Sequence, residues 1–150
     1  MSLQAEVSSK YHISAYILLS HSPDDSRYLF NVAYGVGKAG CDRMAADCGH
    51  ELRKSGVAMI SLWPGPVKTE YITDKMNDGN PMAKLFEKGE TIEFAGIVLA
   101  HLAAESGEAI MARSGRIINT ADVAKQYGFK DIDGTVPVDF RRVTLTLLIT

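Results

Sequence analysis

The stretch from Asn31 to Gly65 constrains the fold of this 150-residue chain more than any other part of it. A helix is predicted from about Val32 to Ser55, with Asn31 as its N-cap. The segment from Val57 to Trp63 is almost entirely apolar, which is typical of a strand covered on both faces in a parallel sheet. Pro64-Gly65-Pro66 then prevents the strand from continuing. The stretch therefore predicts a helix that returns the chain to a buried parallel strand.

The remaining segments extend this alternation of strands and helices. An apolar run at 13–19 predicts a further buried strand, Thr91 is placed to cap a second helix, and 115–119 reads as a short strand. Alternation of this kind is the signature of a parallel sheet covered by helices. We therefore expect one α/β domain over 1–150, with a partial doubly wound, Rossmann-like parallel sheet.

Composition excludes several classes of function. The formal net charge of −2 gives no reason to expect nucleic acid or an anionic membrane surface as a partner. Cys41 and Cys48 lie seven residues apart on the predicted helix, which is too far for a disulfide and favours a reducing compartment. The chain shows no secretory signal pattern and no transmembrane segment, so we expect it in the cytoplasm or on the cytosolic side of an organelle membrane. The histidines show no ligand spacing, and no metal site is expected.

Tyr34 and Lys38 form the first candidate for chemistry. Four residues apart on a helix, they lie on one face, one turn from each other. A free tyrosine has a pKa of about 10, but a nearby ammonium favours the phenolate and makes the phenol a usable general acid or base. Taken alone, this spacing is a weak signal that more often marks a solvated helix face, so its meaning depends on the neighbouring motifs.

A second pattern, Gly35-x-Gly37-x-x-Gly40, matches the pyrophosphate-binding fingerprint. That fingerprint also needs a strand running directly into the first glycine and an acidic residue at the end of the next strand. The next predicted strand ends in Leu62-Trp63-Pro64-Gly65, without an acid. We therefore do not interpret these glycines as a phosphate-binding loop.

The combined order of motifs is more specific than any one of them. Tyr-x-x-x-Lys at 34–38 is followed by a long helix, a strand and then Pro-Gly-x-Val-x-Thr at 64–69. In this order the sequence resembles the short-chain dehydrogenase/reductase family, from about Leu18 to Asp139. The resemblance implies a nucleotide-binding sheet and hydride transfer between NAD or NADP and a small carbonyl or alcohol substrate.

The resemblance also implies roles for individual residues. Tyr34 would exchange the proton with the substrate oxygen. Lys38 would lower the pKa of Tyr34 and hydrogen-bond the nicotinamide ribose. The nicotinamide would be lined by four residues after the strand, with Thr69 reaching its carboxamide: Pro64, Gly65, Val67 and Thr69. Apart from the resemblance, residues 67–89 form a long, breaker-rich insertion, and long insertions of this kind are often lids. We therefore expect a substrate lid there, although Met76, Met82 and Phe86 fit a satellite core equally well.

One departure from the family pattern concerns the serine that polarises the carbonyl, about thirteen residues before the tyrosine. That place holds His21, flanked by Ser20 and Ser22. A shift of one residue in the loop would restore a serine, and a histidine can itself donate from its ring. We rank Ser22 first, and leave open that all three are ordinary loop residues.

A larger departure is that family members are about twice as long. Their glycine-rich phosphate loop has no counterpart before Ile13, where 1–12 reads as an unrelated leader, and half a sheet would leave an apolar strand edge bare. The alternative is therefore a truncated, inactive fragment that acts as a dimerising or regulatory partner, or as a homo-oligomer through helix 32–55. The tail at 140–150 has no assigned role.

Overall fold

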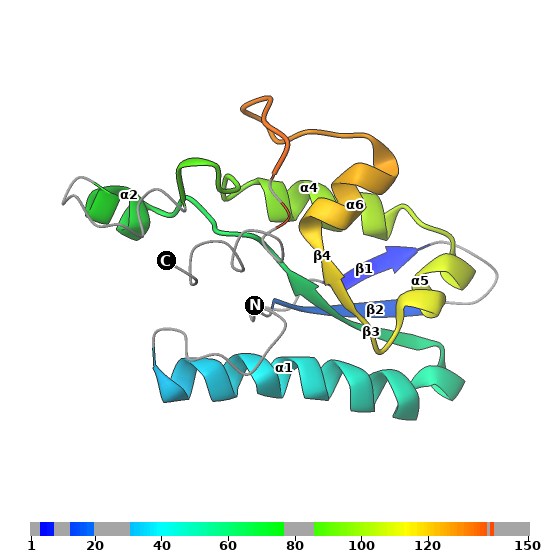
Figure 1. Ribbon diagram of the computed structural model, residues 1–150. Coiled ribbons are helices and arrows are strands. Elements are labelled where there is room, and N and C mark those ends of the chain that lie inside the picture. The colour runs from blue at the N-terminus through cyan, green and yellow to red at the C-terminus, as the bar shows by residue number, and fades with distance from the viewer. Residues whose placement is uncertain (1–3, 8–12, 20–30, 77–85, 138, 140–150) are drawn as a thin grey trace. The chain divides into compact units, whose positions relative to one another are not determined.

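The computed structural model describes residues 4–7, 13–19, 31–76, 86–137 and 139 (Figure 1). Their contacts divide the chain into two compact units, and each unit is described on its own. The first unit comprises Met1–Trp63 and Leu99–Ile118, and the second comprises Pro64–Val98 and Asn119–Thr150. The division runs through one helix and one strand, and the prediction of a single domain over 1–150 stays a prediction.

Four strands form one sheet in the order β1-β2-β3-β4. They are β1 (Gln4–Val7), β2 (Ile13–Leu19), β3 (Val57–Trp63) and β4 (Ile117–Asn119). The last three form a parallel sheet with flanking helices, and β2 pairs with β3 in a register from Ser14 opposite Val57 to Leu19 opposite Leu62. The predicted α/β class is therefore confirmed, and β2 and β3 have the predicted bounds.

A bare apolar strand edge was expected in a partial sheet, but the outer edge of β2 is partly paired. β1 lies antiparallel to β2, with Gln4 opposite Tyr16 and Val7 opposite Ile13. Antiparallel pairing satisfies the backbone groups that an exposed strand edge would otherwise offer to another chain. The segment that was interpreted only as an unrelated leader therefore contributes a strand.

Helix α1 (Val32–Glu51) and the following 3₁₀ turn (Arg53–Ser55) together occupy the predicted helix. The side chain of Asn31 accepts a hydrogen bond from the Tyr34 backbone N–H at 2.9 Å, which confirms the predicted N-cap. Gly56 ends the turn with a φ of 70°, in the left-handed region that favours glycine. This reversal leads the chain directly into β3.

Helix α1 runs along the β2 and β3 strands of the first unit (Figure 1). Its Gly49 is buried, and a Cβ there would overlap the backbone nitrogen of Gly115. Glycine is therefore required where the helix meets the turn before β4. Helix 32–55 was expected to offer a surface for homo-oligomerisation, and the structure places Gly49 of this helix against its own chain.

Short elements complete both units. In the first, α5 (Gly107–Arg113) contacts β3. In the second, α2 (Glu70–Met76) follows the segment after β3, α6 (Thr120–Tyr127) follows β4, and Phe94 is buried with its ring centroid 5.7 Å from that of Phe129. α4 (Phe94–Ala103) belongs to both units. No helix among the described residues is long and apolar enough to cross a membrane.

Candidate active site

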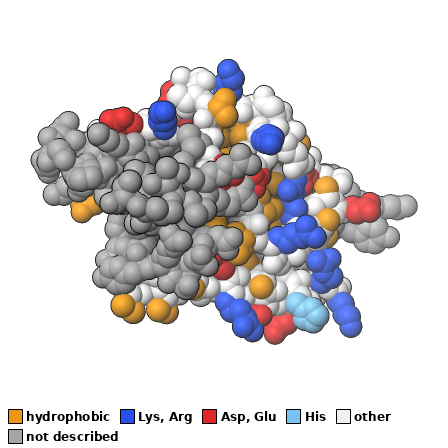
Figure 2. Space-filling view, viewed as in Figure 1, with side chains coloured by type: hydrophobic (Ala, Val, Ile, Leu, Met, Phe, Trp, Pro, Cys, Tyr) orange, Lys and Arg blue, Asp and Glu red, His pale blue; other side chains and the backbone are white. Residues whose placement is uncertain are grey.

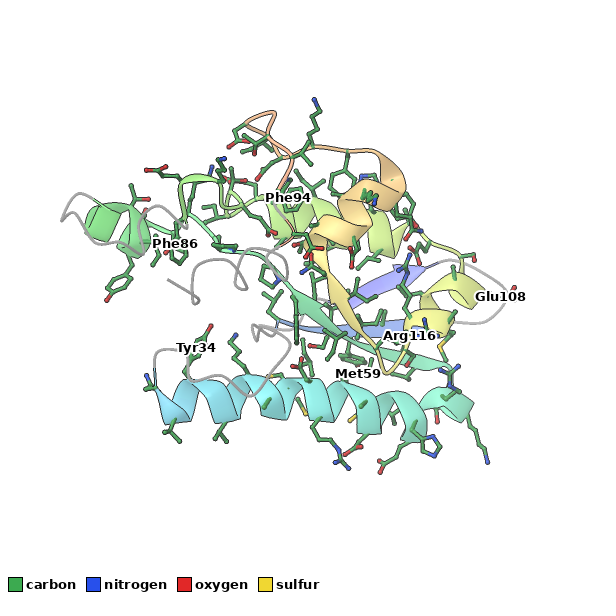
Figure 3. The ribbon with its side chains drawn as sticks, in the orientation of Figure 1. Tyr34, Met59, Phe86, Phe94, Glu108 and Arg116 are labelled. Atoms are coloured by element: carbon green, nitrogen blue, oxygen red, sulfur yellow. The ribbon has the colours of Figure 1, made fainter. Side chains whose placement is uncertain are left out.

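The Tyr34–Lys38 pair lies on one face of α1, as the spacing predicts. The Lys38 Nζ atom stands 5.7 Å from the centroid of the Tyr34 ring, within the range of a cation–π interaction. The same ammonium donates a hydrogen bond to the backbone oxygen of Leu19 at 3.2 Å. Leu19 is the last residue of β2, so the pair lies at the carboxyl end of that strand, where ligands bind in open α/β sheets. Figure 3 shows the Tyr34 side chain projecting from α1 on its sheet side.

The pKa of Tyr34 moves in the opposite direction to the expected one. Burial of its half-buried ring raises the pKa of the phenol above its ordinary value of 10.0. Lys38 lies over the face of the ring and donates its hydrogen bond to a neutral carbonyl. The lowering by Lys38 that the resemblance implies is therefore not seen in this geometry, and the role of Lys38 stays a prediction.

Asp42 is a third member of the same helix face and was not singled out in the sequence. Its Oδ1 atom accepts two hydrogen bonds, one from the Ser61 hydroxyl at 2.5 Å and one from Trp63 Nε1 at 2.9 Å. Ser61 and Trp63 both belong to β3, so Asp42 docks the helix on that strand. Its position four residues after Lys38 is the signal that the sequence offered. Tyr34, Lys38 and Asp42 thus form one row along α1.

The Pro64–Thr69 segment, which carries the other predicted site residues, belongs to the second unit. Gly65 and Pro66 are buried, whereas Pro64, Val67 and Thr69 are half-buried. Val67 pairs with Glu90 in a parallel bridge. A Cβ at Gly65 would come within 2.9 Å of the Glu90 Oε1 atom. The space that a Cβ at Gly65 would need is therefore taken by the side chain of a buried glutamate.

Thr69 has a local structural task in addition to its predicted role. Its hydroxyl accepts a hydrogen bond from the Ile72 backbone N–H at 3.3 Å, at the start of α2. A threonine hydroxyl has one donor and two acceptor sites, so capping the helix is compatible with donation to a ligand. Lys68, its neighbour, forms an ion pair of 3.0 Å with Asp133. Hydrogen bonds from Thr135 and Lys68 lower the pKa of Asp133 to about 2.

Some of the predicted residues lie outside the part of the chain that the structure describes, and the glycine pattern lies within a helix. Ser22, Ser20 and His21 lie outside the part of the chain that the structure describes, as does Met82 of the predicted lid. The glycine pattern at 35–40 lies within α1 and not in a turn between strand and helix, which agrees with its rejection as a phosphate loop. Over the described ranges, no group of three potential ligands could hold a metal ion.

Two curated relatives match most of this chain. Both are called dehydrogenase/reductase SDR family member 1: the human protein is 40% identical over 139 residues, and the mouse protein is 42% identical over 132 residues. These matches cover 87% and 83% of this chain. The chain belongs to the short-chain dehydrogenase/reductase family. It spans about half the length of these relatives, 44% and 42% respectively.

Solved structures of short-chain dehydrogenases/reductases share the fold. An oxidoreductase of this family from Burkholderia thailandensis aligns with a TM-score of 0.56 and 18% identity, over 78% of this chain and 49% of the other. A structure from Agrobacterium tumefaciens with bound NADP aligns with a TM-score of 0.54 and 15% identity, over 72% and 45%. No protein-family model matches the chain.

Proposed function

We propose that the chain carries the catalytic residues of an NAD(P)-dependent oxidoreductase that interconverts a carbonyl compound and an alcohol. The observation that supports this most strongly is the Tyr34–Lys38 pair on one face of α1, with Lys38 bound to the last carbonyl of β2. The relatives and structural neighbours of this chain are short-chain dehydrogenases/reductases, which agrees with the proposed class of reaction. We further propose that this pair and the Pro64–Thr69 segment act on the same substrate and cofactor.

The proposed work of this chain is proton transfer and orientation. The Tyr34 phenol, whose pKa is raised by burial, is protonated at neutral pH and is the group proposed to donate a proton to the substrate oxygen during carbonyl reduction. The Lys38 ammonium would stabilise negative charge left on the phenol and bind the nicotinamide ribose. Ser22 is the proposed donor that polarises the carbonyl.

The residues after β3 fit the nicotinamide half of the cofactor. The nicotinamide, when bound, supplies or accepts the hydride. Pro64, Gly65, Val67 and Thr69 are the residues proposed to hold it, because they follow the carboxyl end of β3, the edge at which α/β sheets bind ligands. The choice between NAD and NADP is left open. The bound NADP of the Agrobacterium tumefaciens structure supports the cofactor class.

The proposal is tested by nucleotide binding to the purified chain. Trp63 is the one tryptophan in the sequence and directly precedes Pro64, so its emission is a specific probe. We expect NADPH or NADH to quench this emission with saturation below millimolar concentration, and nicotinamide mononucleotide to compete for the same site. Absence of binding by both dinucleotides at millimolar concentration would exclude the stand-alone enzyme.

A second proposal is an inactive fragment that acts as a dimerising or regulatory partner. Val32 and Val36 on α1 are 70% and 67% exposed, and hydrophobic side chains are visible along the lower edge of Figure 2. Sedimentation velocity would show a dimer that Val36→Glu dissociates. Val136→Glu is the matched control, because Val136 is 65% exposed in the loop after α6. A wild-type monomer at all concentrations would exclude this proposal.

A further inference from the structure

Glu90 is the most deeply buried carboxylate among the described residues, with 1% of its surface exposed. It lies between the Pro64–Thr69 segment and the start of α6, and no local sequence pattern marks it. Its Oε1 atom accepts a hydrogen bond from the Gly65 backbone N–H at 2.8 Å and another from the Thr120 hydroxyl at 2.5 Å. Oε2 is buried without a hydrogen-bond partner among the residues that the structure describes.

The hydrogen bond from Gly65 to Glu90 gives a buried backbone N–H its acceptor. Proline has no backbone N–H, so Gly65 supplies the only backbone donor in Pro64-Gly65-Pro66. That donor is buried, and a buried N–H without an acceptor costs about 1–3 kcal/mol. Glu90 supplies the acceptor from 25 residues further along the chain.

The backbone of Glu90 holds the same segment at two further points. Its N–H donates to the Pro66 oxygen at 2.7 Å, and its oxygen accepts from the Lys68 N–H at 2.8 Å. Gly89, directly before it, lies so close that a Cβ would overlap the Pro66 oxygen. The side chain and the backbone of one residue thus fix Gly65, Pro66 and Lys68 together.

The hydrogen bond from Thr120 links Glu90 to the end of a second strand, β4. Gly65 lies two residues after β3, and Thr120 directly follows β4. Both segments therefore follow the carboxyl ends of strands, the edge at which α/β sheets bind ligands. We propose that Glu90 is the positioning residue for the nicotinamide-binding segment Pro64–Thr69, holding its backbone in place before the cofactor arrives. This inference rests on the proposed function, because it assigns Glu90 to that same site.

Two conservative variants separate the reach of the side chain from its charge. Glu90→Asp keeps the carboxylate but withdraws it by one methylene, whereas Glu90→Gln keeps the reach and the Oε1 acceptor but loses the charge. The first measurement is amide hydrogen exchange at Gly65 and Lys68. We expect Glu90→Asp to speed exchange at Gly65 at least tenfold relative to amides of β3. We expect Glu90→Gln to leave this ratio of Gly65 exchange to β3 exchange within about threefold of wild type.

The second measurement is the affinity for NADPH and NADH, followed by Trp63 emission. We expect at least tenfold weaker binding for Glu90→Asp, near-wild-type binding for Glu90→Gln, and no change for Glu87→Ala, an exposed glutamate three residues away. If Glu90→Asp is too unstable to study, Thr120→Val removes one of the two donors to Oε1 and is expected to give a smaller change of the same sign.

The outcomes distinguish the inference from the proposed function. If the wild-type chain binds a dinucleotide and Glu90→Asp binds it equally well, the positioning role is overturned and the oxidoreductase proposal stands. Unchanged exchange at Gly65 in that variant would also overturn the role. Failure of the wild-type chain to bind either dinucleotide would overturn the proposed function, while exchange at Gly65 would still decide whether Glu90 holds the segment.

Discussion

At the scale of single residues, the side chain of Tyr34 combines the proposed catalytic group with a packing contact. Its hydroxyl is the group proposed to exchange a proton, while its ring packs beneath the Lys38 ammonium. Removing the hydroxyl leaves the ring and its contacts in place. Tyr34→Phe therefore tests the proton-transfer role separately from packing.

We expect Tyr34→Phe, made in a chain shown to turn over substrate, to abolish turnover by at least a hundredfold while dinucleotide affinity changes less than threefold. General acid–base catalysis typically contributes about 10²–10⁴-fold, which sets the size of this loss. Steady-state kinetics and the Trp63 titration measure the two quantities. Tyr127→Phe on α6 is the control, and full activity of Tyr34→Phe would refute the role given to Tyr34.

Glu90 gives the molecule a pH dependence whose direction follows from its burial. Desolvation raises the pKa of Glu90 from 4.5 to about 7 in the folded chain, with the Asp131 carboxylate adding to the rise. The folded state therefore holds this proton over a pH range in which the unfolded state has lost it. The free energy of unfolding should accordingly fall as pH rises from about 4.5 to about 7, and change little from this source above that range.

The variant Glu90→Gln removes this titration. Its free energy of unfolding should lack the loss of roughly 3 kcal/mol that wild type undergoes between pH 4.5 and 7, a size that follows from the shift in pKa. Urea denaturation of both proteins across this range gives the comparison. Parallel curves for the two proteins would show that Glu90 does not titrate in this window.

At the scale of elements, Asp42 decides how α1 meets β3. Its carboxylate is the acceptor for Ser61, which is fully buried, and for Trp63. Asp42→Ala should destabilise the chain by about 1–3 kcal/mol, because it leaves a buried donor without this acceptor. Urea denaturation followed by Trp63 emission measures the loss. Asp47→Ala is the control, since its ion pair with Arg43 is exposed and such pairs contribute about 0–1 kcal/mol. Equal losses in both variants would contradict a docking role.

The long elements were predictable from local sequence because each carries its own pattern. β2 and β3 are apolar runs ended by breakers, and α1 begins at a capping asparagine and ends near a glycine. β1 and α5 were missed because each is short and depends on packing partners elsewhere in the chain. The second helix was expected to begin at Thr91, yet α4 begins only at Phe94, and Ile92 before it is 63% exposed.

The candidate site was predictable to a different degree. Tyr34 and Lys38 were found because their helical spacing is itself the signal. Thr91 was expected to cap the second helix, but its hydroxyl donates to Asp131 at 2.6 Å, a partner 40 residues away. Glu90 likewise acts through Gly65 and Thr120, which are 25 and 30 residues distant. Such bonds form only when the chain is folded, so no local pattern of residues indicates them.

At the scale of the whole molecule, the two units share α4 and β4, because the division falls within each. A helix or strand that lies partly in each unit cannot remain intact when only one unit unfolds. We therefore expect the units to unfold together, so that a change of stability made in one is felt equally in the other. Helix α1, which lies wholly in the first unit, offers two glycines of opposite expected effect for testing this.

Gly40 is exposed on α1, and a Cβ added there would have nothing within 4 Å among the described residues, so Gly40→Ala should stabilise the helix by about 0.5–1 kcal/mol. Gly49→Ala would force a Cβ into the backbone of Gly115 and should destabilise by about 1–3 kcal/mol or more. Amide exchange at Ile60 reports the first unit, and exchange at Val123 reports the second. If unfolding is shared, Gly40→Ala slows exchange at both amides by the same roughly two- to fivefold factor, and Gly49→Ala speeds both. A response confined to Ile60 would show that the second unit keeps its structure when the first unfolds.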